Sequence, residues 1–536
     1  MAKEKTRSSS KENSSSEEPG NKKKPNNDPN NKTAEKIEKE YENLKLTKSL
    51  QENIDLFNMT VFNDDDSMIF RVFQNKKSEI KFCIFFIDGM IDNLIANKNI
   101  VHPIINSSLK TDIDSNDIPN YLMNEVIDSN SVRLTTSVSK IVESVTYGDT
   151  ILLVEGSDRA LIIDTKGWNT RTISEPQAER VVRGPREGFT ESILINLSMV
   201  RRRIRNSRLK LKFKKIGVRT KTDMCIAYIE DLADPEIVQG IQKKLDSINI
   251  DGVFSTQIIS ELMSNNLITT FKTVGISERP DVIARKLLEG RVAIFCDGTP
   301  MVLTAPHIFM EYFQVNEDYY EDYIFASFNR LIRVLGFFSS ISLPSIYIAL
   351  VNFHQELIPT RLLLSIKQSK QGTPLPSLAE IILLLFTFEI IREAGVRLPS
   401  HIGEAVSIVG ALVLGQAAVD ARIVSAPVVI VTAATGITGL LIPEIIGSTI
   451  IIRSIFLILT SVLGIYGYIF GLMMLFIRLV SIKSFGVPYM LNTGVVNKKY
   501  IKDTWIRAPW WKLNNRSQPI AKDPVRQDSK VNRKRG

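Results

Sequence analysis

The sequence predicts two α/β subdomains in its N-terminal half and, after them, an all-α polytopic membrane domain. In the first part, strand-like apolar runs alternate with helix-like segments, and glycine or proline separates many of them. After Arg330, long stretches carry no charged side chain, as membrane spans require. The hydrophobic content of 44% over 536 residues averages these different parts, so each part is interpreted separately.

Residues 1–48 are predicted to be a disordered polar tail. Ser, Asn, Lys, Glu and Pro dominate them and supply too little apolar area to offset chain entropy. No apolar core follows their positive start, so a secretory signal peptide is not expected. Much of the net charge of +9 lies in the two tails and not on a folded domain beside stacking aromatics, so no nucleic-acid partner is predicted.

Residues 49–170 are expected to form the first α/β subdomain. The run from Phe82 to Ile87 ends at Asp88 and Gly89, which is typical of a strand that enters a turn. Residues 150–155 and 159–165 flank a short glycine-containing break and predict a hairpin. The three cysteines lie far apart inside apolar runs and are interpreted as buried free thiols. The four histidines offer little material for a metal cluster, and no cofactor is expected.

Residues 171–207 are predicted to be a linker with an amphipathic helix that starts near Phe189. Apolar residues recur there every three to four positions and form one face: Ile193, Leu197, Val200 and Ile204. Arginines crowd the end of this helix: Arg201, Arg202, Arg203 and Arg205. This basic end is either solvated or a docking surface for the membrane or for the acidic face of a partner.

Residues 208–325 are expected to form the second α/β subdomain, with helices from about Pro235 and Pro280 and the strand RVAIFCDG. Both subdomains end in a strand, a glycine-containing turn and a short apolar strand, which favours a duplicated or paired design. The sequence lacks phosphate-loop, dinucleotide, zinc-protease and nucleophile-elbow motifs. Asp297-Gly298-Thr299 is interpreted as a hairpin turn, so an enzyme is not expected.

Residues 326–482 are predicted to be a membrane domain of four spans plus one short charged helix. A span needs about 20 apolar residues, and four uncharged stretches are candidates: 334–351, 405–419, 423–443 and 454–477. A further apolar stretch, 381–388, is short and flanked by charges. Helix 378–394 is therefore expected to lie at the interface, to be re-entrant, or to be buried among other helices.

An even number of spans places both ends of the domain on one side of the membrane. Basic residues after the last predicted span mark that side as cytoplasmic. The N-terminal region is therefore expected to face the cytoplasm. Residues 483–536 are predicted to be a basic C-terminal tail, anchored at the membrane interface by tryptophans: Trp505, Trp510 and Trp511.

The segment from Gly403 to Arg422 carries two distinct helix faces. Small residues recur every four positions and allow another helix backbone to approach closely: Gly403, Ser407, Ala411 and Gly415. The adjacent face carries valines followed by polar residues: Val406, Val409, Val413, Gln416 and Asp420. A valine constriction beside a polar ring can hold a pore closed by dewetting. The alternative is a tightly packed helix that lines no pore.

The short charged helix places three ionisable residues at membrane depth: Glu389, Arg392 and Glu393. Their spacing allows Arg392 to pair with either carboxylate across one turn. Structural pairing is one interpretation, and coupling between subunits is the other. Glu444 and Arg453 are expected at the membrane interface.

Several long strings give the chain a family resemblance. They are RVVRGPREGFTESILINLSMVRRRIRN, SERPDVIARKLLEGRVAIFCDGTP, YYEDYIFASFNRLIRVLGFFSSISLPSIYIALVNFHQELIPT, FEIIREAGVRLPSHIGEAVSIVGALVLGQAAVDARIVSAPVVIV and SFGVPYM. From about Ser49 to Trp511 the chain resembles the A subunit of the GerA family of spore germinant receptors. The long Ser/Asn/Lys-rich head departs from this pattern.

The resemblance implies a receptor complex in the spore inner membrane. In such a complex the A subunit assembles with a permease-like B subunit, which holds the nutrient, and with a lipoprotein C subunit. It also implies a homo-oligomeric ring of A subunits around an ion-conducting pore. A solute transporter or permease-like protein is the rival interpretation, favoured by the glycine-rich stretch 432–439 but weakened by too few helices for the usual inverted repeats.

Overall fold

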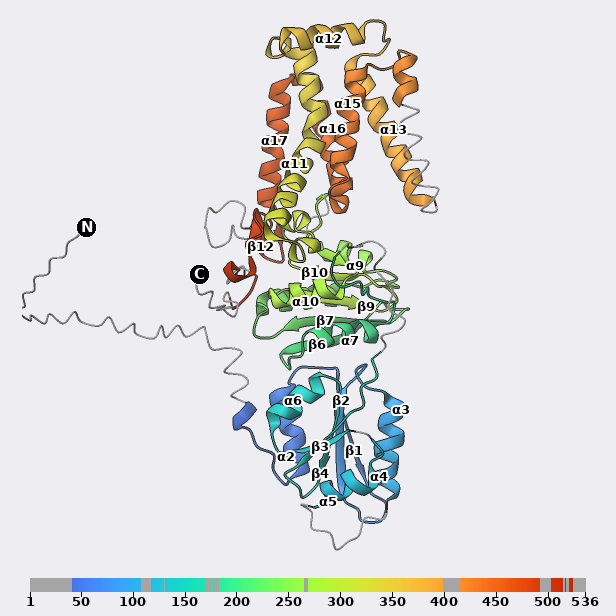
Figure 1. Ribbon diagram of the computed structural model, residues 1–536, viewed down its shortest axis with the longest axis vertical. Coiled ribbons are helices and arrows are strands. Elements are labelled where there is room, and N and C mark those ends of the chain that lie inside the picture. The colour runs from blue at the N-terminus through green and yellow to red at the C-terminus, as the bar shows by residue number, and fades with distance from the viewer. Residues whose placement is uncertain are drawn as a thin grey trace, which may run out of the picture.

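The computed structural model describes residues 41–107, 117–129, 131–168, 176, 179, 181, 183–264, 269–398, 415–491, 503–513, 516 and 520–523. Within these ranges the chain forms two α/β units and a helical bundle, stacked along one long axis (Figure 1). The first unit lies at one end, the second in the middle and the bundle at the other end. The predicted fold class, two α/β subdomains followed by an all-α domain, is confirmed.

The first unit is a five-stranded antiparallel sheet with helices on both faces. Its strands are β1 (Met68–Gln74), β2 (Lys81–Ile87), β3 (Val132–Thr135), β4 (Thr150–Val154) and β5 (Ala160–Ile163), in the order β1-β2-β4-β5-β3. Its helical segments are α2 (Leu50–Asp55), η1 (Leu56–Val61), α3 (Asn93–Ile95), η2 (Ala96–Val101), α4 (His102–Asn106), α5 (Ile118–Tyr121), η3 (Leu122–Val126) and α6 (Val138–Thr146). Alternate residues of β2 enter two cores, one against α2 and α6 and one against α4 and α5. Because both faces are covered, β2 is a continuous apolar run.

The second unit repeats this topology strand for strand. Its strands are β6 (Leu209–Ile216), β7 (Thr222–Ile229), β8 (Gly275–Ser277), β9 (Val292–Cys296) and β10 (Val302–Ala305), in the order β6-β7-β9-β10-β8. Its helical segments are α7 (Ile193–Arg203), α8 (Pro235–Ser247), α9 (Thr256–Met263), α10 (Pro280–Leu288), η4 (Phe309–Phe313) and η5 (Asn316–Tyr319). Helices α8 and α9 cover one face of the sheet, and α7 and α10 cover the other.

Helix α7 belongs to the second unit and is not a free linker. The four apolar residues predicted to share one face are all buried in the core that α7 forms with α10 and the sheet. The predicted amphipathic helix is thus present, but the sequence did not show which surface it covers. The surface is the sheet of the unit that follows it in the chain.

The basic end of α7 docks on the first unit. Arg201 is only 1% exposed and donates to the carboxylate of Asp65 and, over 3.0 Å, to Ser67 Oγ. The backbone N–H of Asp66 donates to the carbonyl of Leu211 over 2.9 Å, so the same loop joins the edge of β6. The acidic face that this basic cluster binds therefore lies within the chain itself.

The bundle consists of α11 (Tyr323–Ile348), η6 (Ala349–Phe353), η7 (Gln355–Leu357), α12 (Thr360–Lys370), α13 (Ser377–Arg397), α15 (Ala426–Gly439), η8 (Pro443–Ile445), α16 (Ile446–Leu463) and α17 (Ile465–Ser481). Among the described residues, two helical segments are long and apolar enough to cross a membrane: 323–353 and 443–463. Helix α12 lies across the far end of the bundle (Figure 1).

The prediction of one span over residues 454–477 is wrong. The chain reverses at Gly464, whose φ of +62° ends α16 and starts α17. A side chain at this position would also lie 2.9 Å from the ring of Phe353. The uncharged run is continuous because the turn itself is apolar, so hydropathy did not reveal it.

The charged helix is longer than the predicted 378–394. Helix α13 has 21 residues and therefore spans about 31 Å at the standard rise of 1.5 Å per residue. It packs against α15, where the ring of Phe388 lies over Gly436 at a distance that leaves no room for a side chain. In the glycine-rich stretch 432–439, Gly436 therefore allows α13 and α15 to pack closely.

The chain enters and leaves the bundle at the same end. Helix α11 begins directly after the second unit, and α17 is followed by the short hairpin β11 (Lys483–Ser484) and β12 (Val487–Pro488). Ser484 Oγ donates to the carbonyl of Thr273 in the second unit over 2.6 Å. Both ends of the helical region therefore lie beside the α/β units.

Candidate functional site

The predicted pore helix is described only at its C-terminal end. Residues 415–420 are helical, and Gln416 Nε2 donates to Asp420 Oδ1 over 3.0 Å along an exposed face. A side chain on Gly415 would meet Val429 of α15 at 3.8 Å, an ordinary packing distance. The other predicted pore and packing residues lie outside the described residues: Val406, Val409, Val413, Gly403, Ser407 and Ala411.

The charged residues of α13 form two separate pairs. Arg392 pairs with Glu389 over 2.6 Å, whereas Glu393 pairs with Arg397 over 2.7 Å. Glu389 also accepts from Arg453 of α16 over 2.9 Å. Arg453 is 5% exposed and is therefore buried inside the bundle. Its expected position at the level of the membrane interface stays a prediction. A guanidinium buried among apolar helices requires a carboxylate partner, and Glu389 supplies it.

Glu380, in the first turn of α13, is a further buried carboxylate that the sequence interpretation treated only as a flanking charge. It accepts hydrogen bonds from the backbone N–H of Ser425 over 3.1 Å and from Ser425 Oγ over 2.6 Å. Ser425 is the N-cap of α15, so the carboxylate lies at the positive end of that helix. The N-terminal end of α13 is thereby bound to the N-terminal end of α15.

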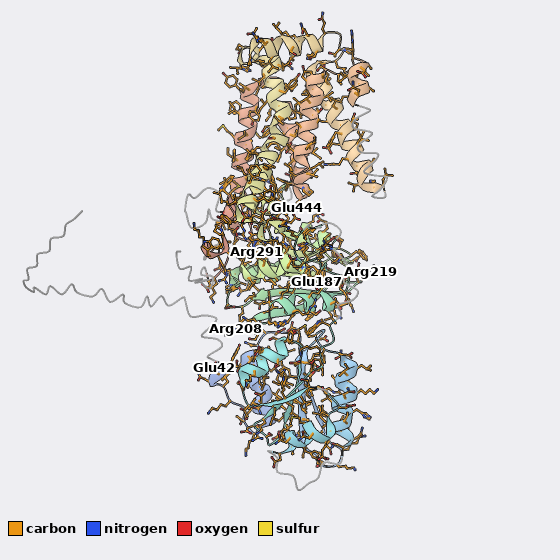
Figure 2. All side chains as sticks on the ribbon, viewed as in Figure 1. Glu42, Glu187, Arg208, Arg219, Arg291 and Glu444 are labelled. Atoms are coloured by element: carbon orange, nitrogen blue, oxygen red, sulfur yellow. The ribbon has the colours of Figure 1, made fainter. Side chains whose placement is uncertain are left out.

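A cavity of about 1210 Å³ lies where the second unit meets the bundle. Its wall is formed by α10, β8 and η4 of the second unit and by the loop 441–444 before α16. Near the C-terminus the lining residues are Asp503, Thr504, Trp510, Lys512, Leu513 and Arg516. Figure 2 places Glu444 at the lower end of the bundle, close to Arg291 of the second unit. We call this space the junction cavity. Among the described residues, no group of three or more His, Cys, Asp or Glu side chains could hold a metal ion.

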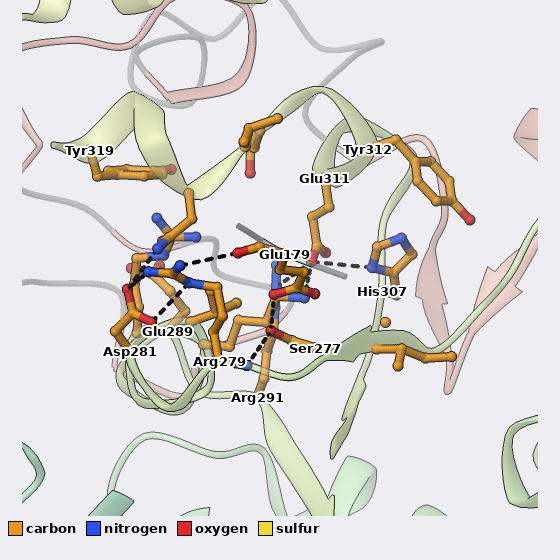
Figure 3. Close-up of a pocket in the computed structure, with 18 of the residues that line it drawn as sticks. Glu179, Ser277, Arg279, Asp281, Glu289, Arg291, His307, Glu311, Tyr312 and Tyr319 are labelled. Carbon is orange, nitrogen blue, oxygen red and sulfur yellow. Dashed lines mark hydrogen bonds and ion pairs between the residues drawn. The ribbon is translucent and has the colours of Figure 1, made fainter. Parts of the chain in front are cut away.

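Glu311 collects three basic groups on one side of the junction cavity (Figure 3). Its Oε2 lies 3.0 Å from Arg291 Nη1, 3.3 Å from Lys286 Nζ and 3.2 Å from His307 Nδ1. Burial acts to raise the pKa of this carboxyl, but the charges of the neighbouring groups outweigh it and hold the pKa well below its usual range. The carboxylate is therefore ionised and fixed in place.

Glu179 lies in the centre of the same cavity (Figure 3). Burial raises its pKa to about 7, and the charge of Glu444 adds to the rise, while a hydrogen bond of 2.7 Å from Ser277 Oγ opposes it. Arg279 donates over 3.2 Å to the backbone carbonyl of Glu179 and pairs with Asp281 over 2.9 Å. Glu179, which stands between the two α/β units in the sequence, is thus held at the wall of the cavity.

A second ionic cluster joins α11 to the second unit and to the C-terminal region. Arg330 of α11 is fully buried and pairs with Asp318 over 3.1 Å. It also donates to the backbone carbonyl of Asp503 over 2.6 Å. Arg333, one turn later, pairs with Asp318 over 2.6 Å. The base of α11 is therefore connected by charge to η5 and to a segment 173 residues further along the chain.

The described residues at the end of the predicted C-terminal tail pack against the second unit and η5. Ile520 lies in the core of the second unit, and Ala521 bridges to Ala233. Trp510 is 53% exposed, but its ring lies 6.0 Å from that of Tyr319 in η5. We call the described residues 503–523 the C-terminal strap. It connects α11, η5 and the sheet of the second unit.

Sequence reasoning missed the junction because its members are scattered along the chain, from Glu179 to Arg516. Two local signals were available. Arg330 and Arg333 stand one turn apart at the start of a long apolar helix, where burial of their stems is expected. Asp318 directly precedes two aromatic residues, Tyr319 and Tyr320. Nothing in the local sequence identifies which acid pairs with which arginine.

Comparison with known proteins gives a consistent result. A family described as "Bacillus/Clostridium GerA spore germination protein" matches residues 57–519. "Spore germination protein KA" of Bacillus subtilis is 38% identical over 90% of this chain and 89% of its own length. "Spore germination protein B1" of the same organism is 35% identical over 90% of this chain and 99% of its own. The crystal structure of the N-terminal domain of the A subunit of the Bacillus megaterium spore germinant receptor GerK3 is 30% identical over 50% of this chain and 98% of that domain, with a TM-score of 0.40.

Proposed function

Because this chain belongs to the Bacillus/Clostridium GerA spore germination protein family, we propose that it is the A subunit of a nutrient-responsive receptor in the spore inner membrane. The observation that carries the proposal is the match to spore germination proteins over nearly the whole chain. The architecture fits this role, since soluble units are joined to apolar helices by a buried ionic junction. A receptor needs such a connection to transmit a signal to the membrane.

The partners we propose are a permease-like B subunit that binds the nutrient and a lipoprotein C subunit. The test is co-expression of the three chains and purification through a tag on this one. Retention of both partners after washing supports the complex. Recovery of this chain alone, folded and monodisperse, contradicts it.

We further propose that copies of this chain form a ring around an ion-conducting pore lined by the helix from Gly403 to Arg422. Val406, Val409 and Val413 would close the pore, because stripping water from a cation in an apolar constriction is costly. Gln416 and Asp420 would form a polar ring beside it. Two features favour a pore-lining role of Gln416 and Asp420: both side chains are exposed, and they share one helix face.

The pore is tested in spores by monitoring potassium release. We expect Val409→Ser or Val413→Ser to release cations without nutrient, since a hydrated constriction no longer excludes ions. The matched comparison is Ser407→Leu, on the face proposed to pack against a neighbouring helix, which is expected to abolish assembly instead. Strictly nutrient-dependent release from spores carrying serine at all three valine positions would contradict the pore. Nutrient-dependent uptake of a solute by this chain alone in liposomes would favour a transporter.

A further inference from the structure

The junction cavity has an excess of positive charge. Among the described residues that line it, eight are Lys or Arg and six are Asp or Glu. The excess is greatest beside Glu311, where Lys286 and Arg291 share one carboxylate. Arg279 already has Asp281 as its partner, and burial raises the pKa of Glu179, the other carboxyl group near Lys286, to about 7. When Glu179 is protonated, one positive charge at Glu311 is left without a matching negative charge. Such a place attracts an anion.

Three nitrogen donors converge there on one anionic oxygen, which belongs to the side chain of Glu311. Each lies within 3.3 Å of the same oxygen, Oε2 of Glu311, although they come from different elements. Lys286 lies on α10, Arg291 at the start of β9, and His307 after β10. The sheet and α10 hold all three in position, so binding an anion would require little rearrangement.

Two buried donors in this group lack an acceptor. Arg291 Nε and His307 Nε2 have no hydrogen-bond partner among the described residues, although both side chains are more than nine-tenths buried. Buried polar groups normally have partners. A ligand that brings several oxygen atoms would satisfy these donors and would also neutralise the excess charge. Phosphate matches this requirement better than a carboxylate, because it offers more oxygens and more charge.

We propose that the junction cavity binds a phosphate group through Lys286, Arg291 and His307. The group is either free phosphate or a phosphate ester such as the headgroup of an anionic phospholipid. The cavity is much larger than one phosphate ion, and the bundle contributes the apolar wall Leu441, Ile442 and Pro443. Because the second unit, the bundle loop and the C-terminal strap all line it, an occupant would hold the soluble part against the membrane part. The proposal goes beyond the receptor role and does not depend on it.

The test uses the purified full-length chain and measures its thermal midpoint. In the first arm, the protein in phosphatidylcholine nanodiscs is titrated with inorganic phosphate against chloride at constant ionic strength. We expect a saturable rise for the native chain and at least about a tenfold weaker response for Arg291→Met, which keeps the side-chain length but removes the charged donors. Arg291→Lys should retain part of the response. Arg219→Met, on an exposed loop of the same unit, is the matched control and should respond like the native chain.

In the second arm, phosphatidylglycerol replaces phosphatidylcholine and no phosphate is added. A rise in the midpoint of the native chain, but not of Arg291→Met, would identify the phospholipid headgroup as the ligand when free phosphate has no effect. If Arg291→Met does not fold, Lys286→Met takes its place in both arms. Equal responses of native and variant chains in both arms would overturn the proposal, whatever the outcome of germination assays.

Discussion

Arg330 shows what a single side chain does at the junction. It is completely buried at the base of α11, and its charge is compensated by Asp318 and by groups of Asp503. Asp318 in turn pairs with two arginines. Removing one partner from a buried ion pair leaves an uncompensated charge in a medium that solvates it poorly. Asp318 is therefore the residue on which the stability of this contact depends most.

We expect Asp318→Asn to destabilise the full-length protein by about 3–5 kcal/mol, because the buried Arg330 and the partly buried Arg333 lose the carboxylate that they share. The measurement is the thermal or denaturant midpoint, followed by tryptophan fluorescence. Asp223→Asn is the control, since Asp223 and its partner Lys215 are both largely exposed and such pairs contribute less than about 1 kcal/mol. Equal shifts for the two variants would show that the junction pair contributes no more than a surface pair.

Glu179 makes the stability of the junction depend on pH. Its pKa in the folded protein is raised to about 7 by burial, from an ordinary value of 4.5. Below pH 4.5 the group is protonated in both states. Between pH 4.5 and 7 the folded state keeps a proton that the unfolded state has lost, so stability falls as pH rises through this window and then levels off.

The native chain should therefore lose on the order of 1–3 kcal/mol more stability than Glu179→Gln as the pH rises from 5 to 7.5, because glutamine mimics the protonated form. Thermal midpoints of the two proteins across this range give the difference. Parallel pH profiles would mean that Glu179 ionises at the same pH in the folded and unfolded states.

At the scale of elements, the turn between α16 and α17 decides how many helices the bundle contains. Gly464 adopts φ +62° and ψ −140°, a conformation available almost only to glycine. The rings of Phe353 and His354 also lie where a side chain at this position would have to fit. The C-terminal strap also connects elements that are distant in the sequence. It contacts α11 through Asp503 and the second unit through Ala521.

Gly464→Ala should destabilise the protein by about 1–3 kcal/mol, from backbone strain and the contact with Phe353. The control is Gly447→Ala in the first turn of α16, where a methyl group meets nothing within 4 Å. That change should be neutral or stabilising by up to about 1 kcal/mol, because alanine favours helix. Thermal midpoints in detergent compare the two. A loss at Gly447 as large as that at Gly464 would contradict the assigned turn.

At the scale of the whole molecule, three bodies are joined by ionic contacts that exclude water. The first and second units meet through Arg201 and Asp65, and the second unit meets the bundle through Arg330 and Asp318. A movement in one unit can reach the helices through these contacts and through the neighbouring hydrogen bonds, such as the one from Ser484 to Thr273. The two sheets have the same strand order, so the chain uses one topology twice in its soluble part.

We expect residues 41–322, expressed without the bundle, to fold as two α/β units that unfold in one transition, because Arg201 docks them together. Arg201→Met should separate this into two transitions in differential scanning calorimetry, since Asp65 loses its partner. Arg219→Met, an exposed arginine of the second unit, should leave a single transition. One transition in both variants would show that the units are joined by other contacts.

The local pattern of the sequence determined the elements whose burial is periodic or continuous. The sequence predicted three such elements: the run from Phe82 to Ile87, the hairpin of β4 and β5, and the apolar face of α7. Buried positions require apolar residues, so their spacing in the sequence indicates the element. The family followed from long strings such as RVVRGPREGFTESILINLSMVRRRIRN. Of the predicted pore and packing residues, Gly415, Gln416 and Asp420 have a described geometry.

Only the tertiary structure decided which partners these elements have. Arg201 was recognised as basic, yet its pairing with Asp65, 136 positions away, depends on how two units stack. Arg453 was predicted to lie at the level of the interface, but the sequence did not show that it is buried against Glu389 of another helix. The hydropathy pattern also predicted one span where α16 and α17 form two helices, because no charged residue interrupts the apolar run at the turn. Sequence patterns report that a group must be buried or compensated, whereas the identity of the compensating group depends on packing between distant segments, which no local pattern encodes.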